Sequence, residues 1–342
     1  WYTEPAFHAF DEAQVIATAW QYAGHTSHLA EPSSYLTLPV AGEPVVVVRT
    51  KEGDLRAFYN VCRHRGGPLA TAACGHLRKG VLQCQYHGWT YRLDGMLRGV
   101  LRFDRTELFD KRDYGLVPVA VQTWEGLVFV HLDDDPPSLA AQMNGIRERI
   151  APLDLTTVQF HQRVVYDVAC NWKVYVDNFL EGYHIPLVHP ELATLLDVRA
   201  YETETYPHYS LQHSPLRGEG ALYGADDSAA FYYFVFPNTV LNILPGRLQV
   251  NRVIPVAADC CQVVFDYAYT DATSPEAQEI IAVDLDLSDR VQAEDAAICA
   301  HVQRGLTSRA YDRGRFSVEA EVGVYHFQCL LKEAYRRALE TA

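Results

Sequence analysis

Two patterns of hydrophobic and polar residues follow one another along this chain of 342 residues. Within residues 6–30, apolar side chains recur at helical spacing and predict a short helical segment. From about Tyr35 to His131, short apolar runs alternate with turns rich in Gly, Pro and Asp, which predicts β-strands. The run Asp133-Asp134-Asp135-Pro136-Pro137 then interrupts this pattern and is typical of a linker.

Beyond the linker, helical and strand-like patterns alternate. The predicted helices cover residues 139–151, 170–184, 275–306 and 319–341. The predicted strands cover residues 158–168, 230–236, 239–256 and 261–269. We therefore predict an α+β protein in three parts: an N-terminal helical segment over 1–34, a β-rich domain over 35–135, and helices on an antiparallel sheet, a helix-grip-like arrangement, over 136–342.

Composition excludes several classes of protein. Lys and Arg number 29 against 43 Asp and Glu, and this net charge of −14 gives no general attraction to nucleic acid or to an anionic membrane. No apolar run approaches the ~20 residues of a membrane helix, and the N-terminus lacks a signal-peptide pattern. Eight Cys are too few for a disulfide scaffold, so we expect reduced thiols and a cytoplasmic location.

Two short clusters supply two Cys and two His. Cys62 and His64 follow one strand-like run, and Cys84 and His87 follow another, so two loop tips offer four ligands to a metal centre. Three interpretations compete: a structural zinc site, unliganded residues clustered by chance, and a Rieske [2Fe–2S] centre with two Cys on one iron and two His on the other. The Rieske centre is the chemical match.

A second Cys-x-His pair, Cys74 and His76, lies only seven residues before Cys84. Seven residues can hardly form the excursion between two opposed loops, whereas the nineteen residues between His64 and Cys84 can. We therefore predict that Cys74 and His76 are loop residues and that Cys62 and His64 are ligands.

A second candidate metal site follows residue 171. On a helix, Asp177, Glu181 and His184 share one face, and Pro186 forces a turn that brings His189 back toward His184. Two His with one carboxylate form the facial triad of non-haem Fe(II) oxygenases, which leaves positions open for O₂. Asp177 can equally be a surface acid of this helix, and we leave it out of the site.

The third ligand is sought among five acids of one predicted helix: Asp284, Asp286, Asp289, Glu294 and Asp295. Asp295 interrupts an apolar stripe formed by Val291, Ile298 and Val302. A buried carboxylate requires a cation or strong hydrogen bonds, so Asp295 is the predicted ligand. Glu294 lies off the stripe and is predicted to be a solvated residue.

The two constellations resemble those of Rieske non-haem iron oxygenase α subunits. The resemblance rests on Cys-Arg-His-Arg-Gly-Gly-Pro-Leu (62–69), Gln-Cys-Gln-Tyr-His-Gly-Trp-Thr-Tyr (83–91) and Gln-Arg-Gly-Leu (303–306). It implies a [2Fe–2S] cluster bound by Cys62, His64, Cys84 and His87, and a mononuclear Fe²⁺ bound by His184, His189 and Asp295. It also implies a homotrimer. Electrons are expected from a separate NAD(P)H-dependent reductase, possibly with a ferredoxin, because the chain has no Gly-x-Gly-x-x-Gly fingerprint.

Glu181 occupies the position of a carboxylate that links the two centres in this family. The resemblance implies that Glu181 hydrogen-bonds His184 on one side and His87 of the partner subunit on the other. Most family members carry Asp at this position, so Glu181 is a departure that some members share. Asn178, one turn earlier, is predicted to support the iron ligands.

The catalytic half is most similar to the choline monooxygenase and glycine-betaine demethylase branch of the family, which implies hydroxylation or N-demethylation of a quaternary ammonium compound. Candidate members of an aromatic box for such a cation are Tyr206, Tyr209, Tyr232 and Tyr233. The alternative substrate is an aromatic acid, its carboxylate held by Arg217 or Arg247. More distant alternatives are a zinc-stabilised binding protein and a pure electron carrier.

Overall fold

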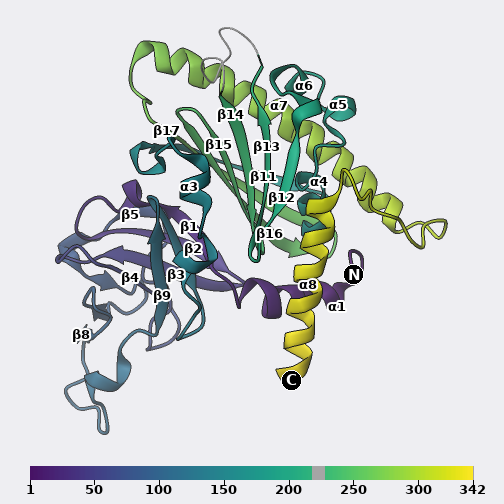
Figure 1. Cartoon of the computed structure of the whole chain (residues 1–342). Helices are drawn as coiled ribbons and strands as arrows, with labels where there is room; N and C mark the ends of the chain where they lie inside the picture. Colours follow the sequence, from purple (N-terminus) through teal and green to yellow (C-terminus); the bar gives the residue numbers. More distant parts are fainter. Residues whose placement is uncertain (218–227, 342) are drawn as a thin grey trace. The chain divides into compact units, whose positions relative to one another are not determined.

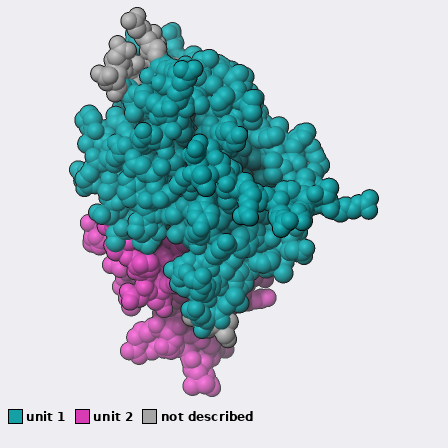
Figure 2. Space-filling model, turned by 45° about the vertical axis from the view of Figure 1, so that its right-hand side comes forward, with its two compact units in different colours: residues 1–15, 141–342 teal, residues 16–140 magenta. Residues whose placement is uncertain are grey.

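The computed structural model describes residues 1–217 and 228–341, which form two compact units. One unit comprises residues 16–140, and the other comprises residues 1–15 and 141–342 (Figure 2). The second unit takes up both ends of the chain, so the predicted N-terminal segment 1–34 is divided between the two units. Among the described residues, no helix is both long enough and apolar enough to span a membrane.

The unit of residues 16–140 is built from two antiparallel sheets (Figure 1). The larger has the order β1-β10-β9-β4-β3-β2-β5 and the smaller the order β6-β7-β8. The strands of the larger sheet are β1 (Gln21–His25), β2 (Ser34–Val40), β3 (Glu43–Arg49), β4 (Leu55–Tyr59), β5 (Cys74–His76), β9 (Pro118–Trp124) and β10 (Leu127–His131). Those of the smaller sheet are β6 (Leu82–Gln83), β7 (Thr90–Tyr91) and β8 (Leu97–Gly99). The sequence thus predicted the β-rich character correctly.

The N-terminal segment is less helical than predicted. Helix α1 (Pro5–Asp11) and a short π-helical turn (Glu12–Ile16) are followed by β1, all five residues of which are buried. A short run that is buried on both faces has no period of two, so periodicity alone does not distinguish such a strand from a buried helix.

The other unit consists of helices on a seven-stranded antiparallel sheet with the order β11-β17-β16-β15-β14-β13-β12 (Figure 1). Its strands are β11 (Gln159–Val168), β12 (Glu202–Thr205), β13 (Tyr209–Pro215), β14 (Ala229–Val235), β15 (Thr239–Leu244), β16 (Arg247–Ala257) and β17 (Cys260–Tyr269). Its helices are α3 (Ile146–Ile150), α4 (Trp172–Phe179), α5 (Ile185–Val188), α6 (Leu192–Leu195), α7 (Pro275–Leu306) and α8 (Val322–Thr341), and α2 (Leu139–Gln142) lies where the two units meet in the chain. The predicted α+β class is confirmed.

One predicted strand is in fact a hairpin. Residues 239–256 were expected to be continuous, but Pro245 and Gly246 form a two-residue turn between Leu244 and Arg247. Gly246 has a φ of +74°, a left-handed conformation that favours glycine. The turn places β15 and β16 side by side, and both strands contribute to the site described below.

Helix α7 begins and ends at the predicted residues, and local residue types explain where it begins. Ser274 precedes the first turn, and its hydroxyl accepts a hydrogen bond of 3.2 Å from the backbone N–H of Ala277. Pro275 occupies the first helical position, where its missing N–H costs nothing. The helix runs for 32 residues and carries acids, amides and a thiol into the interior of its unit.

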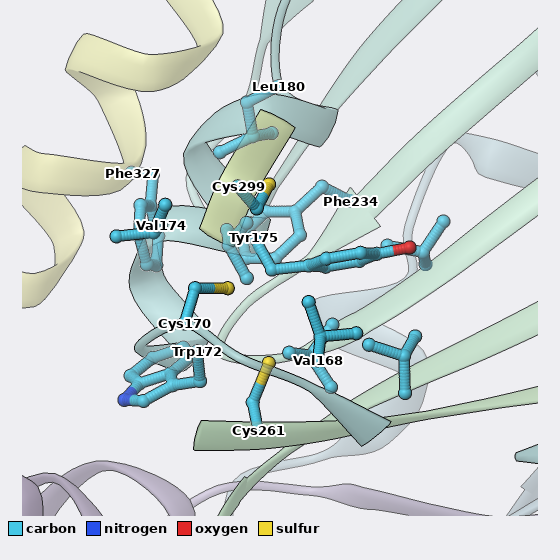
Figure 3. Close-up of a cluster of buried hydrophobic side chains, with 14 of the residues drawn as sticks. Val168, Cys170, Trp172, Val174, Tyr175, Leu180, Phe234, Cys261, Cys299 and Phe327 are labelled. Carbon is cyan, nitrogen blue, oxygen red and sulfur yellow. The ribbon is translucent and has the colours of Figure 1, made fainter. Parts of the chain in front are cut away.

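A mixed aromatic and aliphatic core lies between α4, α7 and the sheet (Figure 3). Trp172, Tyr175 and Phe327 are among its buried members, together with the thiols of Cys170 and Cys299. All eight Cys of the chain are free. This core fixes α4 against α7, and these two elements flank the candidate site.

A buried ion pair joins the start of α4 to the end of α1. The Lys173 ammonium pairs with the Asp11 carboxylate, and neither side chain is exposed. The indole Nε1 of Trp172 donates to Asp11 at 2.9 Å, and the hydroxyl of Tyr335 donates to the other oxygen. A buried charge needs such partners, so the N-terminal helix is tied to the same core as α4.

Candidate functional site

The four predicted cluster ligands lie on two loops of the unit formed by residues 16–140. Cys62 and His64 follow β4, and Cys84 and His87 lie between β6 and β7. Both Cys begin equivalent tight turns: Gly66 N–H donates to the Cys62 carbonyl at 3.0 Å, and Gly88 N–H donates to the Cys84 carbonyl at 3.1 Å. The two loops therefore present one Cys and one His each in a similar way.

The loops approach each other so closely that their side chains converge. A Cβ atom at Gly67 would lie 3.0 Å from the sulfur of Cys84, which explains a glycine at this position. The two sulfur atoms are buried, and the Cys62 thiol lies 3.2 Å from the hydroxyl of Tyr91. A tyrosine hydroxyl at this distance is a suitable hydrogen-bond donor to a cluster thiolate.

The two imidazole rings complete the set. The ring centroids of His64 and His87 are 4.7 Å apart, and His64 stacks on Trp89 at 4.9 Å with the ring planes 8° apart. The Nδ1 atoms of both His are buried, and no other group of the described chain forms a hydrogen bond with them. Two convergent thiols and two unpaired imidazole nitrogens fit the ligand demand of a Rieske cluster.

Cys74 and His76 lie outside this set. They form the ends of β5, which pairs with β2, and both are exposed. His76 Nε2 interacts with the carbonyl of Pro32 at 2.8 Å. Their exclusion from the cluster loops agrees with the chain-length argument, although they belong to a short strand and not to a loop.

The second constellation converges in the other unit. The Nε2 atoms of His184 and His189 are 3.2 Å apart, and Asp295 Oδ1 lies 2.9 Å from the Nε2 of His189 and 3.7 Å from that of His184. Three such donor atoms, all within 4.8 Å of one another, are arranged to hold a metal ion. Two His and one carboxylate are the donor set of a non-haem iron site.

The chain reaches this geometry through a broken helix, which corrects part of the prediction. The helix expected over 170–184 ends at Phe179, and the separate turn α5 begins at Ile185. A continuous helix would bring the Pro186 ring against the carbonyl of Gly182, so the break follows from the sequence. His184 and His189 therefore flank α5, as the argument from Pro186 anticipated.

Asp177 consequently shares no helical face with Glu181 and His184. Its carboxylate accepts hydrogen bonds from the hydroxyl of Tyr2 at 2.5 Å and from Nε2 of Gln328 at 2.9 Å. Desolvation in this position raises the pKa of the Asp177 carboxyl to about 7. Asp177 is thus a structural acid that joins α4 to α8, and its interpretation as a surface acid was wrong.

Each iron-site imidazole is held from behind by a carboxylate. Glu181 Oε1 lies 2.6 Å from His184 Nδ1, and its second oxygen accepts the His184 backbone N–H at 3.0 Å. Glu294 Oε2 lies 2.7 Å from His189 Nδ1. A carboxylate at Nδ1 keeps the proton there and leaves the Nε2 lone pair directed at the metal.

The sequence reasoning missed the contact that Glu294 makes with His189. It was predicted to be solvated, and its side chain is 41% exposed, yet it orients a predicted ligand. The apolar stripe used to select Asp295 does not extend to Val302, because Val302 is exposed. The buried positions of α7 in this region are Gln292, Cys299 and Gln303. No periodic signal distinguishes Glu294, since it lies at the edge of the buried face.

Asn178, for which a supporting role was predicted, contacts one of the predicted ligands. Its Nδ2 donates to Asp295 Oδ1 at 2.6 Å. The same oxygen faces both imidazoles, so Asn178 fixes the position of the carboxylate that the His residues share.

A cavity of about 150 Å³ opens beside the three converging donor atoms. It is enclosed by α4, α5, α7 and the sheet strands β14, β15 and β16. Aromatic rings that line it come from Tyr175, Phe179, Tyr201, Tyr232 and Phe265. Polar residues that line it at a distance from the triad are Asn242, Arg247, Gln249, Asn251 and Ser288.

Only one of the four predicted box tyrosines, Tyr232, lines this cavity. Tyr233 is its neighbour in β14, and successive side chains of a strand point to opposite faces. Tyr209 packs against Tyr233 at 5.7 Å and stacks on Tyr206 at 4.5 Å, so these rings form a separate cluster. Two other tyrosines, Tyr175 and Tyr201, line the cavity together with Tyr232, and no local pattern in the sequence indicated them.

The two candidate arginines also differ. Arg217 is exposed and pairs with Asp197. Arg247 is buried, lines the cavity and pairs with Asp284 at 2.7 Å. The Arg247 charge is therefore compensated within the wall of the cavity.

Comparison with known families and proteins agrees with both centres. The family model described as the Rieske [2Fe-2S] domain matches residues 19–110, and that described as the ring hydroxylating alpha subunit (catalytic domain) matches residues 155–337. The chain therefore belongs to the Rieske non-haem iron oxygenases and is an oxygenase α subunit, an oxidoreductase that contains a [2Fe–2S] cluster and a mononuclear iron. Such subunits take electrons from a partner reductase and act on small molecules with O₂.

Relatives of known activity cover nearly the whole chain. Choline monooxygenase of the Arabidopsis thaliana chloroplast is 34% identical over 348 residues, which cover 97% of this chain and 81% of the relative. The carnitine monooxygenase oxygenase subunit of Acinetobacter baumannii is 31% identical, with 98% and 93% covered. A solved quaternary ammonium Rieske monooxygenase superposes with a TM-score of 0.88 at 32% identity, with 97% and 93% covered. Naphthalene 1,2-dioxygenase, at 18% identity and a TM-score of 0.77, shares the fold.

The position of Glu294 behind His189 makes a testable prediction. Replacing it (Glu294→Ala) removes the group that fixes the imidazole, so we expect the affinity for Fe²⁺ at the mononuclear site to fall about 10- to 100-fold. Competition with a calibrated chelator measures this affinity. The matched control is Glu279→Ala, an exposed acid on the same helix, which should leave the affinity unchanged. Unchanged iron affinity in Glu294→Ala would show that the contact has no role in binding.

Proposed function

We propose that this chain is the terminal oxygenase that hydroxylates or N-demethylates a small quaternary ammonium compound. The observation that carries the proposal is the cavity beside His184, His189 and Asp295, whose wall is rich in aromatic rings. Aromatic faces attract a desolvated cation that has no proton to donate, and quaternary ammonium groups are ligands of this kind.

The charges around the cavity support a cationic substrate. Asp295, Glu181 and Glu294 place three carboxylates at or behind the metal ligands, which is one negative charge more than a bound Fe²⁺ neutralises. Among the described residues that line the cavity, the one arginine is Arg247, and its charge is compensated by Asp284. Proteins named for the oxidation of choline and of carnitine are among the relatives, and one solved relative is a complex with γ-butyrobetaine.

The residues that would hold the two metal centres are assigned as follows. Cys62, Cys84, His64 and His87 would hold the [2Fe–2S] cluster, and His184, His189 and Asp295 would hold Fe²⁺. When bound, the cluster supplies electrons one at a time and the ferrous iron supplies open coordination positions for O₂. We further propose that the predicted domains 35–135 and 136–342 are the cluster domain and the catalytic domain; the two compact units have the bounds 16–140 and 1–15 with 141–342.

The protein groups around the iron ligands perform positioning work. Glu181 and Glu294 hold the Nδ1 protons of His184 and His189, and Asn178 holds the Asp295 oxygen that faces both rings. The aromatic wall limits access of water and places an N-methyl group toward the three ligands. These groups are in place before the substrate binds, which lowers the cost of ordering the site.

Glu181 also has a role between copies of the chain in this proposal. It would link His184 to His87 of the partner subunit in a homotrimer, and a reductase in the cytoplasm, with or without a ferredoxin, would supply the electrons. Residues 60–112, which contain the cluster loops, hold ten Lys and Arg against four Asp and Glu, whereas the chain as a whole has a net charge of −14. This asymmetry favours docking of the cluster-bearing region on an acidic surface.

The substrate class is tested by a single turnover of chemically reduced, iron-replete protein under O₂. One pool contains trimethylammonium compounds and the other contains aromatic acids. We expect formaldehyde or a hydroxylated product from the first pool and none from the second. Hydroxylated product from the aromatic acids alone would contradict the proposal and favour the aromatic-acid alternative.

The link through Glu181 is tested with Glu181→Gln. The oxygen of the amide can still accept a hydrogen bond from His184 Nδ1, but the amide lacks the negative charge of the proposed link between the centres, so we expect both metal centres to persist while steady-state turnover falls about 100-fold. Iron content and the electron paramagnetic resonance of the reduced cluster report the two centres. Near-normal turnover would contradict the assignment.

Mixing two inactive variants separates transfer between copies from transfer within one copy. Cys62→Ser lacks a cluster ligand and Asp295→Ala lacks an iron ligand. If electrons cross between copies, co-assembled chains should regain part of the turnover. Mixed assemblies that stay inactive would show that both centres of one chain must work together.

A further inference from the structure

The polar residues of the cavity wall form an ordered row that the proposed reaction does not yet use. Tyr232, Asn242, Gln249 and Tyr267 are direct cross-strand neighbours in β14, β15, β16 and β17. Such neighbours share one face of a sheet, and Tyr232, Asn242 and Gln249 all line the cavity. Asn242 is therefore a buried amide in the middle of the wall.

The side chain of Asn242 contains a hydrogen-bond acceptor that no described group of the chain donates to. Its side-chain oxygen Oδ1 is buried, and no group of the described chain donates a hydrogen bond to it. The residue as a whole is only 9% exposed. A buried acceptor left unpaired is costly, so a ligand that donates to it gains binding energy.

The polar side chains near Asn242 form hydrogen bonds with one another. Arg247 donates from Nε to Asp284 and from Nη2 to the side-chain oxygen of Gln249. Gln249 donates from Nε2 to Asn251 at 2.8 Å. Asp284 in turn accepts from the hydroxyl of Tyr269 at 2.5 Å. This chain of contacts fixes the wall and leaves Asn242 Oδ1 as its unpaired acceptor.

The row lies at a suitable distance from the metal ligands. The hydroxyl of Ser288 in α7 contacts Tyr267 at 2.8 Å and Gln249 at 3.4 Å. Ser288 is therefore the position on α7 that lies beside the row. Asp295 is seven residues further along α7, which corresponds to two turns on the same face and about 10 Å. A small molecule that reaches Asn242 with one end therefore presents its other end to the triad.

We propose that Asn242 determines specificity by accepting a hydrogen bond from a hydroxyl group at the end of the substrate remote from the oxidised carbon. This inference rests on the proposed function, because it assumes that a quaternary ammonium compound binds in the cavity. It narrows the substrate class to ammonium alcohols.

A hydroxyl suits this wall better than a carboxylate does. A hydroxyl donates one hydrogen bond, which is what Asn242 Oδ1 lacks, whereas an ionised carboxylate has no hydrogen to donate. A carboxylate would also need a cation, and the charge of Arg247 is already compensated by Asp284, with both side chains buried. Betaines are therefore disfavoured, because their carboxylate would be an uncompensated buried charge.

The test compares two ligands that differ only at the proposed contact. Choline carries the hydroxyl, and propyltrimethylammonium replaces it with a methyl group. For the wild-type holoenzyme we expect kcat/KM to favour choline by about ten- to hundredfold. In Asn242→Leu this preference should fall to about one, because the acceptor is gone while the branched shape of the side chain is kept. Dissociation constants from calorimetry for both ligands should follow the same pattern.

The matched control is Leu244→Met, an apolar substitution on the same strand and the same cavity wall, which should keep the preference for choline. Each protein is measured with both ligands, so a general loss of folded enzyme cancels in the ratio. Equal rates for the two ligands in the wild type, a preference that survives in Asn242→Leu, or a preference for γ-butyrobetaine over choline would each overturn the role of Asn242. If no trimethylammonium compound is bound or oxidised, the proposed function itself fails.

Discussion

The iron site depends on one constraint: two imidazoles must direct the same ring nitrogen at the same point. An imidazole has two nitrogens, and which of them carries the proton is set by the partner of the other. Here both Nδ1 atoms face carboxylates, those of Glu181 and Glu294, so both Nε2 atoms are available and meet Asp295. Without these two contacts the rings would be free to rotate or to change tautomer, and the three donor atoms would no longer converge.

The rest of the catalytic unit holds this geometry in place. The break at residues 180–184 separates His184 from α4, and the single turn α5 brings His189 back to it. Helix α7 passes beside both and supplies Asp295, with Cys299 one turn later buried in the core against Tyr175 and Cys170 (Figure 3). Because interiors are packed as densely as organic crystals, a shift of α7 against α4 would be resisted by this core. The buried pair of Asp11 and Lys173 ties the N-terminal helix to the same structure.

The features that the sequence predicted well are those that local rules specify. The loop spacing separated Cys62 and His64 from Cys74 and His76, and the helix predicted over residues 275–306 has those bounds in the structure. Pro186 indicated the turn that returns His189 to the site. Each of these inferences depends on a short stretch of chain, where residue type restricts the backbone directly.

The features that were missed depend on contacts between distant segments. Glu294 was read as solvated because its helix position lies at the edge of the buried face, and only the packing of α5 on α7 gives it a partner. Tyr232 and Tyr233 are adjacent in sequence, yet only one faces the cavity, and the register of β14 against β15 decides which. A surface position was left open for Asp177 because α8, more than 140 residues later, is what covers it. Periodicity reports whether a face is buried, but not what buries it.

The central claim is that the two ligand sets are separate and that each binds iron, and a single spectroscopic measurement tests it. Mössbauer spectroscopy of protein grown on iron-57 distinguishes cluster iron from mononuclear ferrous iron. The account predicts about three irons per wild-type chain, of which Asp295→Ala loses only the ferrous one and Cys62→Ser loses only the cluster. If Asp295→Ala kept its full ferrous signal, or if one substitution removed both kinds of iron from a folded protein, the assignment of the two centres would be contradicted.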